Sequence, residues 1–147
     1  MNPLNSKEII LTKLGYIEEY LGKLEPLLSL PTEQLLVDDL RLPVIERYLQ
    51  LMIDTAIDIN TLIIQVENLQ ASEDYQGTFA IMASSKVLPH ELAFAMAPSV
   101  GLRNLLVHQY EKIDKKMMVN DAKRDIGQYR QYVKYVFEYT GRISQKS

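Results

Sequence analysis

Residues 43–69 read PVIERYLQLMIDTAIDINTLIIQVENL, and this stretch decides the fold class. Its apolar residues recur every three or four positions, which is the spacing of an amphipathic α-helix. They form two adjacent stripes, Ile45, Leu49, Met52, Ala56, Ile59, Ile63 and Val66 in the first and Tyr48, Leu51, Thr55 and Leu62 in the second. A helix with two such faces needs two packing partners. One is its own domain, and the second is either another copy of the chain or, as in many bundles, more of the same domain.

Helical spacing also precedes this stretch. Ser6 is a candidate cap for a helix whose apolar stripe runs on to the region of Pro26 and Pro31. Thr32 is a candidate cap for a short helix that reaches about Leu40.

The remainder of the chain is helical in pattern as well. Residues 70–77 are polar and predict a loop, after which helices are expected over 78–87 and 89–108. Pro98 is expected to break or kink the second of these. A final helix begins at Asn120 or an earlier residue. With no strand alternation visible, the pattern predicts an all-α bundle of about five helices.

Length and composition fit one globular domain covering residues 1–147, with its core within about 6–140. The chain has 47% hydrophobic and 24% charged residues, and it lacks cysteine, which excludes disulfides and thiolate chemistry. No apolar run approaches the ~18 residues of a membrane span, and the first residues lack the pattern of a signal peptide, so a cytoplasmic protein without a membrane partner is expected. Residues 1–102 carry a net charge of −8 and residues 103–147 carry +5. The basic third favours a polyanion, while the acidic remainder argues against a protein that coats DNA or RNA without specificity.

One segment, GLRNLLVHQYEKID at residues 101–114, gathers four groups suited to phosphodiester chemistry. A neutral imidazole, here His108, can take a proton from a ribose 2′-hydroxyl, and the guanidinium of Arg103 can hold the phosphate. Asn104 and Tyr110 can position either group by hydrogen bonds. On an ideal helix Arg103 and Tyr110 share a face, whereas His108 lies ~140° around from Arg103, so the pair converges only if the helix ends or distorts near the histidine. The simpler alternative is an arginine and a histidine satisfied by nearby carboxylates, Asp114 or Glu111.

Other residues that could bind a metal are weaker candidates for a functional site. His90 is expected to be structural or merely exposed. Asp54 and Asp58 are expected to be solvated or ion-paired, because the third and fourth ligands of a metal site are missing from the pattern.

The sequence Arg103-Asn104-Leu105-Leu106-Val107-His108-Gln109-Tyr110 resembles the Arg-x-x-x-x-His-x-Tyr signature of the HepT subfamily of HEPN-domain proteins. Residues 46–60 are similar to the matching HepT helix, so the resemblance covers about residues 6–140. It implies a HEPN-like helical bundle that forms a homodimer with the motifs facing a shared cleft. It also implies a ribonuclease toxin paired with an MntA-like nucleotidyltransferase antitoxin, which transfers AMP to the motif tyrosine. Arg103 and His108 then match the catalytic pair, and Tyr110 matches the modified residue.

On this interpretation the reaction requires no metal and no cofactor, because the 2′-hydroxyl is an internal nucleophile. RNA, with tRNA as one candidate, is expected to be bound by the basic residues Lys112, Lys115, Lys116, Lys123 and Arg124. A weaker candidate RNA surface combines Arg130 and Lys134 with Tyr132, Tyr135 and Tyr139, although tyrosines at helical spacing usually pack inside.

Two other functions use the same residues. In the first, the chain is a non-catalytic helical dimer that acts as the partner or regulatory subunit of a nucleotidyltransferase. In the second, it is a structural dimer with a buried polar network. Pro98 departs from the family pattern of a smooth helix before the motif, and it bears on the geometry of the site.

Overall fold

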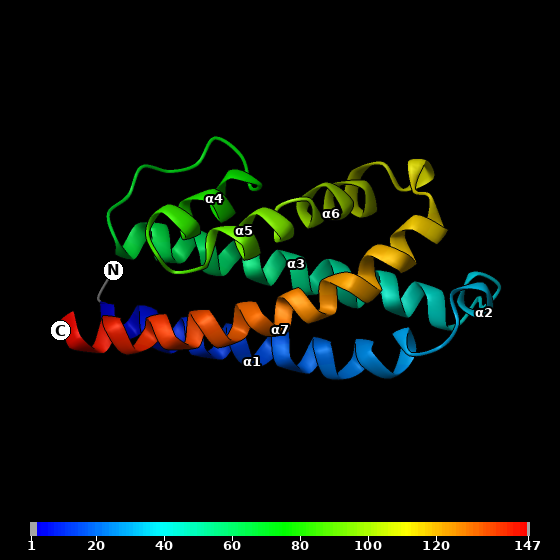
Figure 1. Ribbon diagram of the computed structural model, residues 1–147, viewed down its shortest axis with the longest axis horizontal. Coiled ribbons are helices and arrows are strands. Elements are labelled where there is room, and N and C mark those ends of the chain that lie inside the picture. The colour runs from blue at the N-terminus through cyan, green and yellow to red at the C-terminus, as the bar shows by residue number, and fades with distance from the viewer. Residues whose placement is uncertain (1–2, 147) are drawn as a thin grey trace.

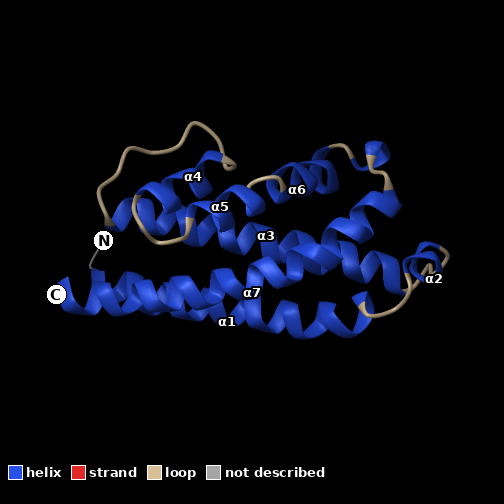
Figure 2. Cartoon of the chain, viewed as in Figure 1, coloured by secondary structure: helices blue, strands red, loops and turns tan. Residues whose placement is uncertain are grey.

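The computed structural model describes residues 3–146, and within them the chain is helical, with no strand (Figures 1 and 2). The all-α prediction is confirmed. The elements in order are α1 (Pro3–Leu28), α2 (Thr32–Leu36), α3 (Arg41–Val66), α4 (Gly77–Ser84), α5 (His90–Met96), α6 (Ser99–His108), the 3₁₀ turn η1 (Tyr110–Lys112) and α7 (Lys115–Lys146). The short α2 and the break between α5 and α6 were both expected from the sequence.

The long helices α1, α3 and α7 run the length of the molecule, and α1 is antiparallel to α3 and α7, which run in the same direction (Figure 1). Helix α1 packs against both α3 and α7, and α6 packs along α3 on another side. Helices α4 and α5 pack on each other and cover α3 and α7, while α2 closes the end of the bundle near the start of α7. This arrangement places α3 between α1 and α6, so the side chains of α3 reach the segment that carries the motif.

Several helix boundaries differ from the sequence expectations. Helix α1 begins at Pro3, so Ser6 lies buried inside it and is not its cap. Thr32 is the first residue of α2, not the cap, and α2 ends at Leu36, before Leu40.

The last helix begins earlier than Asn120 because a carboxylate caps it. Asp114 Oδ1 accepts the backbone N–H of Met117 at 3.0 Å, which satisfies a donor that the first turn leaves unpaired. Asn120 is therefore an interior residue of α7.

Helix α3 meets its need for two packing partners within the chain itself. Residues of both apolar stripes are buried, including Thr55 and Leu62 of the second one. By length and composition α3 is apolar enough to cross a membrane, but 61% of its most apolar window is buried inside this bundle. The two apolar faces therefore do not by themselves require a second copy, and the homodimer stays a prediction.

Polar groups inside the bundle are joined by hydrogen bonds. Tyr132 donates its hydroxyl to Asn60 Oδ1 at 2.7 Å, and the Asn60 amide donates to Thr78 Oγ1 at 3.1 Å. The hydroxyls of Tyr129 and Ser99 lie 2.8 Å apart and tie α7 to the start of α6. These bonds offset the cost of burying polar groups.

Asp125, on the buried side of α7, is only 2% exposed, and burial raises the pKa of its carboxyl to about 6. Arg124 opposes this shift, since its Nη2 lies 3.5 Å from Asp125 Oδ1. Because the folded carboxyl binds its proton more tightly than the unfolded one, folding favours the protonated form of Asp125.

We expect Asp125→Asn to gain stability relative to the wild type as the pH rises. Between pH 4 and 6 the unfolded wild type ionises Asp125 first, so the contribution of Asp125 to wild-type stability falls as the pH rises, by at most about 3 kcal/mol for a folded pKa of about 6. The asparagine variant has no such loss. Urea unfolding at pH 4 to 7 measures the difference, with Asp121→Asn, at a more exposed position on the same helix, as the control. A difference between Asp125→Asn and wild type that stays constant over this range would contradict the assignment.

Candidate active site

Helix α6 carries the motif, and Pro98 sets where it starts. Ala97 and Pro98 both have right-handed helical angles, and tight turns join Val100 N to Ala97 O and Gly101 N to Pro98 O. The expected break at Pro98 is confirmed: the proline separates α5 from α6 and leaves the motif helix regular after it. Since α6 runs antiparallel to α3, residues late in α6 lie opposite residues early in α3.

Arg103 is fixed by three contacts. Its Nε donates to Asp54 Oδ1 on α3 at 2.5 Å, and Nη1 donates to Asn104 Oδ1 at 3.1 Å. The centre of the guanidinium lies 5.6 Å from the centre of the Tyr75 ring, within cation–π range. Of the five N–H donors of a guanidinium, two are engaged by described residues, so three remain for an anion. The geometry therefore fixes the guanidinium of Arg103 while leaving it donors with which it can bind an anion.

The loop between α3 and α4 places Tyr75 against Arg103. Ser72 Oγ donates to Asp74 O at 2.6 Å, and Asp74 Oδ1 accepts the N–H of Gly77 at 2.7 Å. A Cβ at Gly77 would lie 2.3 Å from Ser72 Oγ, so a larger residue there would displace this hydroxyl from its bond to Asp74. The predicted loop is thus ordered by its own side chains.

A hollow of about 470 Å³ opens where this loop faces α6. Its lining residues are Glu73, Asp74, Tyr75, Gln76, Val100 and Asn104. The hollow therefore adjoins the side chain of Asn104, which bonds to Arg103.

His108 is the last residue of α6, and its side chain is exposed. Gln109 leaves the helical region with φ −142° and ψ 48°, so the helix ends just where convergence of Arg103 and His108 requires it. In residues 3–146 we find no hydrogen bond or ion pair to the imidazole. Neither Asp114, which caps α7, nor Glu111 satisfies the pair, because the partner of Arg103 is Asp54.

Tyr110 lies beyond the end of α6, in η1, so the expectation that it shares a helical face with Arg103 is wrong. Its hydroxyl donates to both carboxylate oxygens of Glu46 on α3, at 2.9 Å each. The ammonium of Lys115 lies 5.2 Å from the centre of the tyrosine ring. Its polar interaction with Tyr110 raises the pKa of Lys115 above the usual lysine value, against the opposing effect of desolvation.

Comparison with known proteins places this geometry in a family. The model of the family described as Ribonuclease HepT-like matches residues 17–136. The chain belongs to the HepT-like ribonuclease family. It is 34% identical to the tRNA nuclease HepT of Aphanizomenon flos-aquae over 133 residues, which cover 89% of each chain. It is 24% identical to the mRNA nuclease HepT of Shewanella oneidensis over 85 residues, covering 58% of this chain and 64% of the relative.

The fold matches solved structures of the same type. The tri-AMPylated HEPN toxin of Shewanella oneidensis, solved in complex with its MNT antitoxin, superimposes with a TM-score of 0.80 at 20% identity. The match covers 88% of this chain and 97% of that one. At this identity the likeness establishes the HEPN bundle fold and nothing finer.

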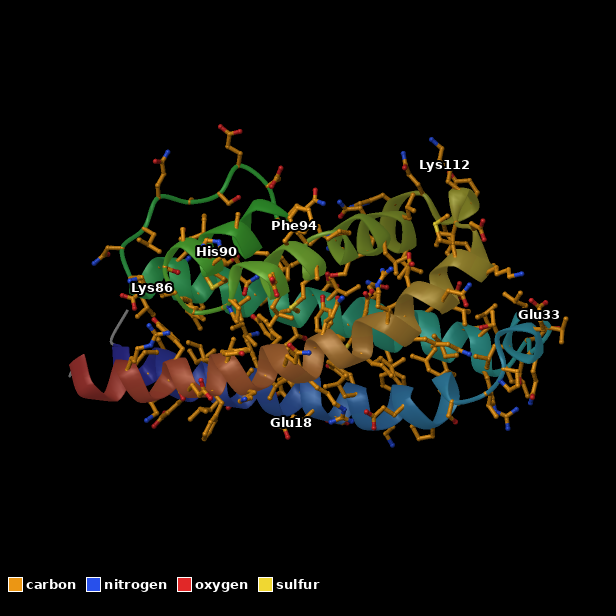
Figure 3. The ribbon with its side chains drawn as sticks, in the orientation of Figure 1. Glu18, Glu33, Lys86, His90, Phe94 and Lys112 are labelled. Atoms are coloured by element: carbon orange, nitrogen blue, oxygen red, sulfur yellow. The ribbon has the colours of Figure 1, made fainter. Side chains whose placement is uncertain are left out.

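The predicted RNA-binding residues are only partly brought together. Lys115 lies over the ring of Tyr110, and Lys112, labelled in Figure 3, is the last residue of the same short η1 turn that Tyr110 begins. The other three point to different partners: Lys116 to Glu33 at 3.3 Å, Lys123 to the carbonyl of Leu30 at 2.8 Å, and Arg124 to Asp121 at 3.3 Å.

The second candidate RNA surface does not form, because Tyr132 and Tyr139 are buried in the core. Packing, the simpler interpretation of this tyrosine stripe, is the observed one. His90 lies on α5, away from Lys112 (Figure 3), and in the described part of the chain no group of three potential metal ligands occurs.

The sequence did not single out two residues of the site, Asp54 and Glu46. Asp54 was expected to be solvated or ion-paired, and it is ion-paired with Arg103, while Asp58 pairs with Lys13 at 3.7 Å. Glu46 was noted only as part of residues 46–60, the helix that is similar to the matching HepT helix, and no role was assigned to it. One signal in the sequence could have found them. Glu46 and Asp54 lie eight residues apart on one predicted helix, a spacing close to the seven residues between Arg103 and Tyr110.

Proposed function

We propose that this chain is a metal-independent endoribonuclease that acts as the toxin of a toxin–antitoxin pair. One observation carries the proposal. Asp54 orients the guanidinium of Arg103, which keeps unused N–H donors, and the exposed imidazole of His108 lies on the same short helix. Membership of the HepT-like ribonuclease family supports it.

The chemistry follows from the groups present. His108 removes the proton of a ribose 2′-hydroxyl, whose oxygen attacks the adjacent phosphorus, and the 5′-oxygen leaves with a proton returned by an acid. Arg103 binds the phosphate oxygens and stabilises the charge that develops on them. Asn104 keeps the guanidinium in place. The products are a 2′,3′-cyclic phosphate and a 5′-hydroxyl.

The substrate is RNA, and a tRNA is the first to test, because the relative that matches over the greater length is a tRNA nuclease. Lys112 and Lys115 stand beside the motif and supply positive charge for the RNA backbone. The reaction takes place in the cytoplasm, where such RNA is found.

The antitoxin is a nucleotidyltransferase that transfers AMP from ATP to Tyr110. The AMPylated toxin of Shewanella oneidensis in complex with its antitoxin supports this part of the proposal. The phosphodiester adds negative charge at the site, which competes with RNA for Arg103, and the nucleoside adds bulk.

Arg103→Ala and His108→Ala are each expected to lower RNA cleavage by ~10²-fold or more, because each removes a group that acts in the transition state. Cleavage of total RNA by purified protein, with a chelator present, measures this. His90→Ala is the matched control, since the chain has two histidines and His90 lies on another helix. If folded Arg103→Ala and His108→Ala cleave RNA as fast as the wild type, the site is refuted and the non-catalytic partner of a nucleotidyltransferase is favoured. Loss of wild-type cleavage in chelator would refute the metal-free mechanism.

Asp54→Asn is expected to lower kcat by about 10-fold or more while the protein stays folded. The variant removes the charge that orients Arg103, and misplacement of a phosphate-binding group is costly in the transition state. Asp58→Asn, one helical turn along α3 and paired with Lys13, is the control. A change confined to KM, or an equal effect of both variants, would show that Asp54 does not position Arg103.

We also propose that the active species is a homodimer. In a single chain His108 faces solvent at the end of α6, and a second copy would complete a cleft over it. Light scattering at micromolar concentration is expected to give about twice the chain mass of 16.9 kDa. A monomer that cleaves RNA at the same concentration would show that one chain suffices.

A further inference from the structure

We infer that Glu46 is the base that activates Tyr110 for AMP transfer, so that the toxin supplies part of the catalytic machinery for its own inactivation. The inference rests on the proposed function, in which Tyr110 receives AMP. It assigns to the toxin a step that would otherwise be left to the partner enzyme.

The position of the carboxylate carries the inference. Glu46 is 7% exposed and projects from α3, a helix buried on most of its faces, so its carboxylate is held in place. The Tyr110 hydroxyl donates to both of its oxygens at 2.9 Å, while the tyrosine residue is 45% exposed. The proton of the nucleophile therefore already points at an acceptor, and the rest of the side chain is open to a partner.

A comparison inside the chain shows what is particular about this pair. Tyr139 also donates to a glutamate, Glu67, at 2.9 Å, but Tyr139 is 1% exposed and inaccessible to an enzyme. Tyr132 is buried as well, and it donates to Asn60, which is not a base. Tyr110 thus differs from Tyr132 and Tyr139 because it has both a hydroxyl bonded to a carboxylate and an exposed ring.

AMP transfer to Tyr110 is a displacement at the α-phosphorus. The phenolic O–H proton passes to Glu46 as the oxygen attacks the α-phosphorus of a nucleoside triphosphate. An O–P bond forms to Tyr110, the bond from the α-phosphorus to its bridging oxygen breaks, and pyrophosphate leaves. A nucleophile with an adjacent base held in bonding distance is the usual arrangement for such activation.

Lys115, at the start of α7, places a positive charge over the ring of Tyr110. Its ammonium lies over the ring at 5.2 Å, and it also feels the charges of Glu46 and Asp39. A cation there stabilises the phenolate as it forms and then the phosphodiester that replaces it. The charged groups that contact Tyr110 are thus Glu46 from α3 and Lys115 from α7, and Asp39, from the segment before α3, adds a weaker negative charge that acts on Lys115.

The experiment is the rate of AMP transfer to the full-length chain from radiolabelled MgATP by the cognate nucleotidyltransferase, at pH 7 to 9. Glu46→Gln keeps an acceptor for the hydroxyl but loses the basicity, so its rate is expected to fall ~10²-fold or more. Its residual rate should climb with pH, because hydroxide then replaces the missing base, whereas the wild-type rate stays nearly flat. Glu67→Gln, which alters the same kind of bond at Tyr139, is the matched control and should react like the wild type.

Two further measurements keep the result interpretable. Peptide mass spectrometry locates the AMP, with Tyr110→Phe as the blank, and failure to modify Tyr110 in the wild type would overturn the proposed antitoxin function itself. If the wild type is modified but Glu46→Gln reacts as fast or faster, Glu46 is not the base, and a faster rate shows that it restrains the hydroxyl. Should Glu46→Gln fail to fold, Glu46→Asp is used, and an intermediate rate with a flat pH profile supports the base, while a rate equal to the wild type in all variants overturns it.

Discussion

The antiparallel contact of α6 with α3 is the constraint on which the site depends. Helix α3 is held by α1 on one side and by the motif helix on another, and its apolar side chains leave it little freedom to slide or rotate. The acidic residues on α3 are therefore presented at fixed positions. Each meets a different residue of the motif: Asp54 meets Arg103, and Glu46 meets Tyr110.

The two acid contacts divide the motif into parts with different tasks. The pair of Asp54 and Arg103 joins opposite charges in a partly buried place, where a charged hydrogen bond fixes the direction of the guanidinium. The pair of Glu46 and Tyr110 joins a phenol to a carboxylate that is almost buried. In the functions proposed above, one contact orients a cation for phosphate and the other holds a hydroxyl for proton loss, so that cleavage and its inhibition would depend on neighbouring but separate side chains of α3.

Pro98 and the end of α6 set the boundaries of this arrangement. The proline starts a regular helix after it, and the turn at Gln109 stops that helix directly after His108. The short η1 then carries Tyr110 back toward α3 before Asp114 caps α7. Had the helix continued, Tyr110 would have followed the face of Arg103. Its departure into η1 gives it a carboxylate of its own.

Local patterns in the sequence determined the helices, the loop, the break at Pro98 and the four polar residues of the motif, because periodicity, proline and residue type act within a few positions. The helix caps at Ser6 and Thr32 were misplaced because a cap depends on the first turn that tertiary packing allows. The partners of Arg103 and Tyr110 lie 49 and 64 positions away. Only the register of α6 on α3 selects Asp54 and Glu46 from the other acids, and only packing decides that Tyr132 and Tyr139 are buried. Sequence therefore supplied the polar groups of the motif, and the tertiary structure supplied the carboxylates that bond to two of them, since contacts between distant helices follow from burial of the whole core.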